Sequence, residues 1–149
     1  MLRRDLIKFI TSSSILLSGI LKPLFGLAKW NQAAFDSTDY KSAVNNYFPE
    51  QQFEQSDKIK IKVRPVIENG AVVPIKIETN INNIESITIF VETNPTPLIA
   101  NFDLFPGCLG SVSARIKMEQ PSDIIVVVKA DNKLYSTKTF VEVHEGGCG

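Results

Sequence analysis

Short stretches in which every second residue is apolar recur from residue 58 onward, and this pattern constrains the fold more than any other feature. Residues 59–64 and 111–118 show it most clearly, because isoleucine, valine, alanine or methionine alternates there with lysine, arginine or serine. Such alternation places one set of side chains on a buried face and the other set in water. Each stretch therefore predicts a half-buried β-strand.

The same pattern extends over the rest of this region and predicts about seven strands. Residues 124–128 form a continuous apolar run, which predicts a strand buried on both faces, and Asp131-Asn132 predicts a hairpin turn before the last strand. No helical pattern separates the strands, so we expect an antiparallel β-sandwich over residues 58–143. The predicted strands lie near residues 58–64, 73–78, 87–91, 98–104, 111–118, 124–128 and 134–143.

Residues 29–57 form an N-terminal segment with one predicted short helix. Tyr40, Ala43, Val44 and Tyr47 follow the i, i+3, i+4, i+7 spacing of one apolar helical face, and Pro49 ends the pattern. This face packs either on the body of the domain or on a partner subunit, and the sequence leaves both alternatives open.

Residues 1–28 have the pattern of an export signal. Arg3 and Arg4 precede a run of apolar and small residues, and this resembles a twin-arginine (Tat) signal, which exports folded proteins. We expect cleavage near Ala28, a periplasmic location and no membrane attachment after signal removal. The alternative, an uncleaved membrane anchor, would need about 20 apolar residues, and this run is shorter and rich in serine and threonine.

The charge balance argues against nucleic-acid binding. The chain has 16 Lys and Arg against 16 Asp and Glu, a formal net charge of zero. Residues 1–28 hold four of the basic and one of the acidic residues, which leaves 12 against 15, a net charge of −3, for the mature chain. A chain with this balance has no excess of cations to neutralise phosphates.

The sequence ends in Gly146-Gly147-Cys148-Gly149, and we interpret residues 144–149 as a flexible carrier arm. Glycines on both sides of a cysteine leave the backbone little restrained and the sulfur accessible. Such an arm suits a substrate held on a tether. It does not suit an enzyme nucleophile, which needs a base and oxyanion donors in fixed positions. We therefore expect a covalent carrier, with no bound cofactor.

The terminal cysteine has two alternative roles. Cys148 and Cys108 are the only cysteines, and in an exported protein they could form a disulfide. The chain would then be an exported structural β-sandwich protein tethered through a disulfide at its tail. His144 and Cys148 could also bind a metal, but two ligands are too few for a closed site.

These features together resemble the SoxY family of sulfur carriers. The resemblance covers nearly the whole mature chain, and the terminal glycine-cysteine motif at the end of a twin-arginine-exported sandwich is its most specific part. Further stretches that resemble the family are residues 68–75 (ENGAVVPI), 91–97 (VETNPTP), 113–118 (SARIKM) and 131–135 (DNKLY).

The resemblance implies an immunoglobulin-like sandwich that pairs with a SoxZ-like subunit in a heterodimer. It implies that a haem-containing enzyme, SoxAX, couples thiosulfate to Cys148 and that a hydrolase, SoxB, releases sulfate. The remaining sulfane sulfur would be oxidised by a sulfane dehydrogenase or passed on. Two features depart from the family pattern: only Gly149 follows the cysteine where two glycines are common, and Cys108 is not expected.

Overall fold

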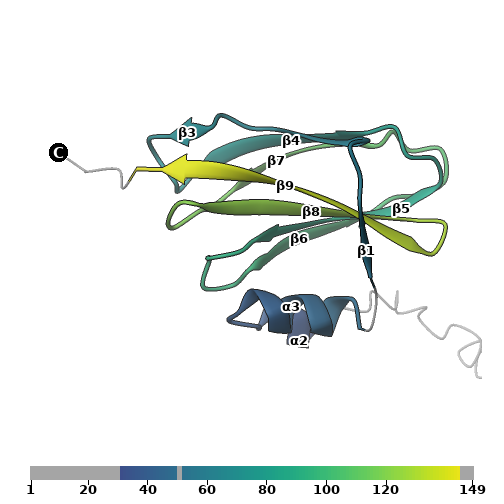
Figure 1. Ribbon diagram of the computed structural model, residues 1–149, viewed down its shortest axis with the longest axis horizontal. Helices are drawn as coiled ribbons and strands as arrows, with labels where there is room; N and C mark the ends of the chain where they lie inside the picture. The colour runs from purple at the N-terminus through teal and green to yellow at the C-terminus, as the bar shows by residue number, and fades with distance from the viewer. Residues whose placement is uncertain (1–30, 50–51, 145–149) are drawn as a thin grey trace, which may run out of the picture. The chain divides into compact units, whose positions relative to one another are not determined.

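The computed structural model describes residues 31–49 and 52–144, which form two β-sheets and a helical layer (Figure 1). The smaller sheet, the larger sheet and the helices follow one another from top to bottom in this view. In the part of the chain that the structure describes, no helix has the length and apolar character needed to span a membrane.

The larger sheet has six strands, and its centre is the antiparallel pair β8 and β9. β5 pairs antiparallel with β8, and β6 with β5, whereas β1 and β3 pair in parallel with β9. The bounds are β1 (Phe53–Gln55), β3 (Val66–Ile67), β5 (Ile84–Val91), β6 (Leu98–Asp103), β8 (Ser122–Ala130) and β9 (Lys133–Val143).

The smaller sheet has the order β2-β4-β7 and is antiparallel throughout. Its strands are β2 (Ile59–Lys62), β4 (Val73–Thr79) and β7 (Ser111–Ile116). The chain passes from β1 in the larger sheet through β2 in the smaller sheet and returns as β3. This path explains the two parallel pairings, because β1 and β3 run alongside the start and the end of β9 in the same direction.

The main hydrophobic core lies between the two sheets. It is formed by the inward-facing residues of the alternating strands, which bury isoleucine and valine on one face and leave lysine, arginine and serine on the other. The fully or nearly fully buried members with large side chains include Val73, Ile77, Ile87, Ile89, Val91, Met118, Ile124, Val126 and Val128.

The helices cover the other face of the larger sheet. Helix α2 (Gln32–Phe35) begins after Asn31, and helix α3 (Tyr40–Tyr47) begins after Asp39, whose side chain accepts a hydrogen bond from the Ser42 N–H at 2.9 Å. Ala43 and Tyr40 of α3 belong to a second apolar cluster with Phe90 of β5. Of the two alternatives that the sequence left open for this helical face, the structure shows packing on the body of the domain.

The predicted immunoglobulin-like β-sandwich is confirmed, with additional elements. Residues 124–128 lie in β8, whose alternate side chains enter the two apolar clusters on its opposite faces, as the apolar run predicted. The hairpin turn at Asp131 and Asn132 is also confirmed, since both residues have positive φ and join β8 to β9. Nine strands are described where about seven were predicted, and α2 was not predicted.

Candidate functional site

Strand β9 leads directly to the predicted carrier arm and is held by backbone hydrogen bonds up to its end. The Glu142 N–H donates to the Pro65 carbonyl at 2.9 Å, and the His144 N–H donates to the Ile67 carbonyl at 2.9 Å. His144 is the last residue that the structure describes. The base of the arm is thus fixed four residues before Cys148. The other predicted site residues also lie outside the described residues: Gly146, Gly147, Gly149, Arg3 and Arg4.

The side chain of His144 faces solvent at this base. It is 60% exposed, and its Nε2 lies 4.0 Å from the Glu142 carboxylate. Among the residues that the structure describes, no three His, Cys, Asp or Glu side chains lie close enough to hold a metal ion. Cys148, the other ligand of the metal alternative, lies outside the described residues.

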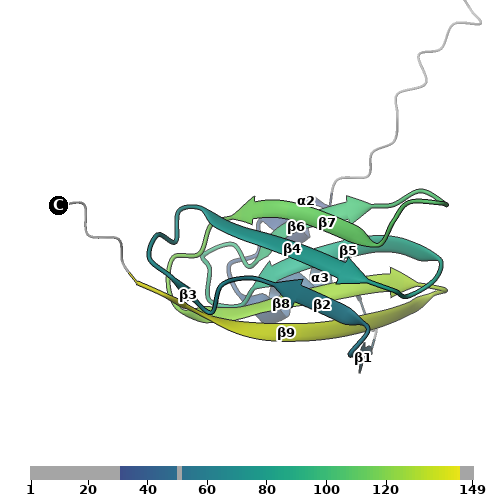
Figure 2. The same ribbon diagram turned by 90° about the horizontal axis from the view of Figure 1, so that it is seen from above.

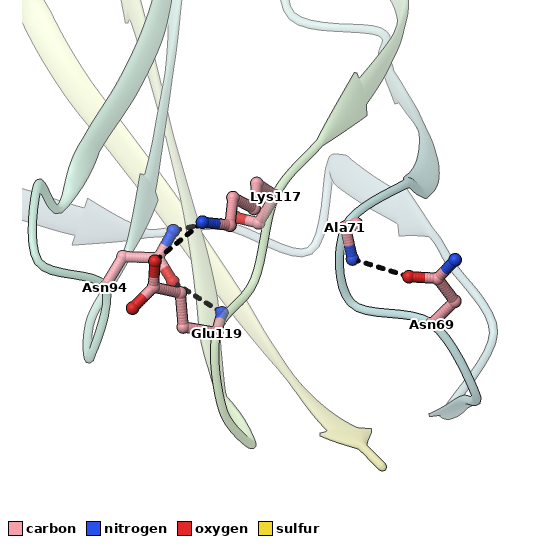
Figure 3. Close-up of polar contacts among 5 residues, drawn as sticks. All are labelled: Asn69, Ala71, Asn94, Lys117 and Glu119. Carbon is pink, nitrogen blue, oxygen red and sulfur yellow. Dashed lines mark hydrogen bonds and ion pairs between the residues drawn. The ribbon is translucent and has the colours of Figure 1, made fainter. Parts of the chain in front are cut away.

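Gly70 brings a loop backbone against the end of β9. A Cβ atom added at Gly70 would collide with the carbonyl oxygen of Met118 and would lie 2.7 Å from Cγ1 of Val143. The Gly70 carbonyl accepts a hydrogen bond from the Met118 N–H at 2.8 Å. In the same turn the Asn69 side chain accepts from the Ala71 N–H at 2.9 Å (Figure 3). Only a residue without a side chain permits this approach.

Asn94 joins two loops at the same end of the sandwich. Its Nδ2 donates to the Lys117 carbonyl at 2.7 Å, and its Oδ1 accepts from the Glu119 N–H at 3.1 Å (Figure 3). The residue is only 6% exposed. The side chain therefore links the loop of residues 93–97 to the backbone of residues 117–119 through two hydrogen bonds. Lys117 and Glu119 also form an exposed ion pair at 2.7 Å.

We predict that Asn94→Ala lowers the free energy of unfolding by about 2 kcal/mol, because it leaves a partly buried carbonyl and N–H without their partner. Urea denaturation of the mature chain measures this loss. The matched control is Asn69→Ala, which removes one exposed and local hydrogen bond and is expected to cost less than about 1 kcal/mol. Equal costs for the two variants would contradict the proposed link between the loops.

Cys108 lies in a turn of the β6–β7 connection. The Cys108 N–H donates to the Phe105 carbonyl at 3.0 Å, with Pro106 and Gly107 between them and φ of +90° at Gly107. Proline followed by a glycine of positive φ is the sequence of a type II turn. The thiol is free and exposed.

This turn lies at the end of the sandwich where β9 begins. Gly110 contacts Ile84, which pairs with Ala130, and Ala130 pairs in turn with Lys133, the first residue of β9. In Figure 2 the β6–β7 connection lies at the right, whereas the tip of the β9 arrow lies at the left. Cys108 and the base of the arm thus occupy opposite ends.

An intrachain disulfide between Cys108 and Cys148 does not fit this arrangement. The eleven residues of β9, Lys133–Val143, span about 36 Å at about 3.3 Å per residue. Four residues from His144 to Cys148 reach at most about 14 Å. Because a disulfide needs its two Cα atoms within about 7 Å, Cys148 cannot reach the β6–β7 connection of its own chain.

Sequence reasoning missed Gly70 and Asn94 as the residues that shape the base of the arm. Both were seen only as members of the stretches that resemble the SoxY family, residues 68–75 and 91–97. Their contacts join segments 23 to 73 residues apart, which no local pattern reveals.

The comparisons with known proteins agree with this geometry. A family model described as "Sulfur oxidation protein SoxY" matches residues 44–148. The structure of the sulfur carrier protein SoxY from Chlorobium limicola f thiosulfatophilum is 34% identical, covers 70% of this chain and 96% of its own, and has a TM-score of 0.64.

A superoxide reductase (neelaredoxin) from Ignicoccus hospitalis is 10% identical over 58% of this chain and 80% of its own, with a TM-score of 0.53. At this identity the match shows only that the two folds are similar. No curated protein sequence matches significantly. The family match covers most of the chain, including the described sandwich from residue 44 onward and Cys148 itself. The chain therefore belongs to the SoxY family of sulfur oxidation proteins.

Proposed function

We propose that the chain holds thiosulfate-derived sulfur covalently on Cys148 and presents it to partner enzymes. The observation that carries this proposal is the SoxY family match, which extends through residue 148. The structure supports it by fixing β9 up to His144, four residues before the cysteine. A thiol so close to the end of a firmly held strand can be offered to another protein while the domain itself stays folded.

The loading step is an oxidation of two sulfur atoms. The Cys148 thiol and thiosulfate form a cysteine S-thiosulfonate by a new sulfur–sulfur bond, and one proton and two electrons leave. The coupling enzyme, SoxAX, would accept the two electrons one at a time through its haem iron. The carrier supplies the sulfur nucleophile but no electron acceptor.

The unloading step is a hydrolysis. Water attacks the outer sulfone, the bond between the sulfane and sulfone sulfurs breaks, and sulfate and a proton leave a persulfide on Cys148. The hydrolase SoxB performs this step. A sulfane dehydrogenase then oxidises the remaining sulfur, or the sulfur is passed on.

The chemical activation of Cys148 belongs to these partners. Glu145 is the nearest acidic residue along the sequence, and a negative neighbour disfavours the thiolate. The proposal therefore includes a SoxZ-like subunit as heterodimer partner, SoxAX and SoxB as modifying enzymes, and a periplasmic location reached by the Tat route.

The alternative function, an exported structural protein tethered through its tail, can no longer use an intrachain bridge between the two cysteines. It would need a disulfide from Cys148 to another chain. A lasting disulfide of that kind would occupy the sulfur that a carrier needs.

Intact-mass measurement of the mature chain, incubated with thiosulfate and the purified coupling enzyme, tests the proposal. We expect an added thiosulfonate group on the peptide that contains Cys148, and a reductant should remove it. A chain that stays unmodified, or that is recovered only as a disulfide-linked dimer through Cys148, would contradict the carrier function and favour the structural alternative.

A further inference from the structure

The outer face of the smaller sheet is strongly basic. Strand alternation turns Lys60, Lys62, Lys76 and Arg115 to solvent, against the single carboxylate of Glu78. The face thus carries three net positive charges on three short strands. Figure 2 looks onto this face, with β2, β4 and β7 in front of the larger sheet.

The strand register gathers these cations into one continuous patch. Lys62 pairs with Lys76 across β2 and β4, Lys76 pairs with Ser113 across β4 and β7, and Arg115 lies opposite Pro74. A shallow depression of about 610 Å³ lies between them and is lined by these five residues together with Ile75 and Ala114. An arginine fork, an ammonium group and a hydroxyl around one depression match the geometry of a carboxylate.

Glu78 offsets only part of this charge. Its carboxylate lies 2.5 Å from the ammonium group of Lys62 and 2.7 Å from that of Lys76. These two hydrogen bonds lower the pKa of Glu78 to about 2, so the group stays ionised at neutral pH. Lys60 and Arg115 have no ion pair among the described residues.

The remainder of the described chain has the opposite sign. Outside this face, residues 31–49 and 52–144 hold seven Lys or Arg against twelve Asp or Glu, a net charge of −5. A positive face on an otherwise negative molecule orients an approaching charged partner, because its field adds over several side chains.

The basic face and the base of the arm share one end of the sandwich. The pair Pro74–Arg115 adjoins the pair Val73–Ile116 at the end of β7, and the chain then reaches Met118, whose backbone meets Gly70 beside β9. A protein bound over this face would therefore stand next to the point where the arm leaves the domain.

We propose that the outer face of β2, β4 and β7 docks an acidic surface of the enzyme that loads the arm, with carboxylates seated in the depression between Lys76 and Arg115. This inference rests on the proposed function and names the surface through which that function is performed. A protein fits better than a membrane, because the uncharged side chains of the face are Pro74, Ser111 and Ser113, and none is a bulky apolar anchor.

The test measures association of the mature chain with the purified haem-containing coupling enzyme by surface plasmon resonance. The variant Lys62→Glu/Lys76→Glu/Arg115→Glu is expected to lower the association rate about tenfold or more at about 50 mM salt. The difference should shrink at about 500 mM salt, where surface charges are screened. The matched control, Lys41→Glu/Lys133→Glu/Lys138→Glu, makes the same charge change on exposed residues elsewhere and should alter the rate less than about threefold.

A second variant distinguishes an effect of charge from an effect of misfolding. Glu78→Gln removes the only carboxylate of the face and is expected to raise the association rate about twofold or more, whereas damage to the sheet would lower it. Thermal unfolding and the reaction of Cys148 with Ellman's reagent verify that domain and thiol are intact.

The outcomes separate the two proposals. If the enzyme and thiosulfate fail to modify the wild-type chain, the proposed function is wrong. If the chain is modified but the two triple variants associate at equal rates, the docking surface is wrong and the carrier function stands. Loss of binding to phosphatidylglycerol vesicles in the first triple variant, with unchanged enzyme association, would replace the protein partner by a membrane.

Discussion

Replacing Cys148 by serine is expected to abolish thiosulfate loading while leaving the stability of the domain unchanged. A serine hydroxyl is almost never ionised at neutral pH and cannot form the sulfur–sulfur bond that loading requires. The substituted residue lies four positions beyond His144, outside the described sandwich. We therefore expect no adduct in the intact mass, no thiosulfate-dependent electron transfer to the coupling enzyme, and a change in unfolding free energy below about 0.5 kcal/mol.

Cys108→Ser is the matched control for this experiment. Cys108 is exposed and free, and it lies at the opposite end of the sandwich from the base of the arm. This variant should load like the wild type. Loading that survives Cys148→Ser and disappears in Cys108→Ser would contradict the proposal, because the sulfur would then be carried by Cys108.

Local pattern was enough to predict the sandwich. In β8 the unbroken run of residues 124–128 predicted burial on both faces, and the structure provides a cover for each: the smaller sheet on one side and the helices on the other. The single apolar face of α3 predicted the helix equally well, because side chains three and four residues apart share one face. In these elements the local hydrophobic pattern is enough to predict which faces are buried.

The short parallel strands could not be predicted in this way. β1 has three residues and β3 has two, which is too few for an alternation to be recognised. Both exist because β9 offers a free edge over eleven residues, so their position depends on a strand whose paired residues lie 76 to 81 positions later in the chain.

The candidate site also combines local features, which the sequence reveals, with features that depend on distant segments. The glycine-cysteine motif is a local feature and was readable at once, and its role on Cys148 remains a prediction. The end of the sandwich where β9 terminates is shaped by Asn94 and Gly70, whose partners come from distant segments. The basic face of the smaller sheet likewise appears only when the register places lysines of β2 and β4 beside an arginine of β7.

Gly70→Ala is expected to destabilise the domain strongly, by about 3 kcal/mol or more, because overpacking against a backbone is not relieved by a rotamer change. The new methyl group would meet the Met118 carbonyl oxygen and Cγ1 of Val143 at the end of β9. For a domain of this size the loss corresponds to a fall in Tm of about 10 °C. Urea denaturation and thermal unfolding of the mature chain measure both quantities.

Gly107→Ala separates this steric effect from backbone strain. Gly107 has φ of +90°, but no atom lies within 4 Å of an added Cβ. Its substitution should therefore cost only about 1 kcal/mol of conformational energy. If the two alanine variants lost equal stability, the contact of Gly70 with Met118 would not be what positions the end of β9. If Gly70→Ala alone unfolds at low urea, the sandwich depends on this backbone approach at the end where β9 terminates.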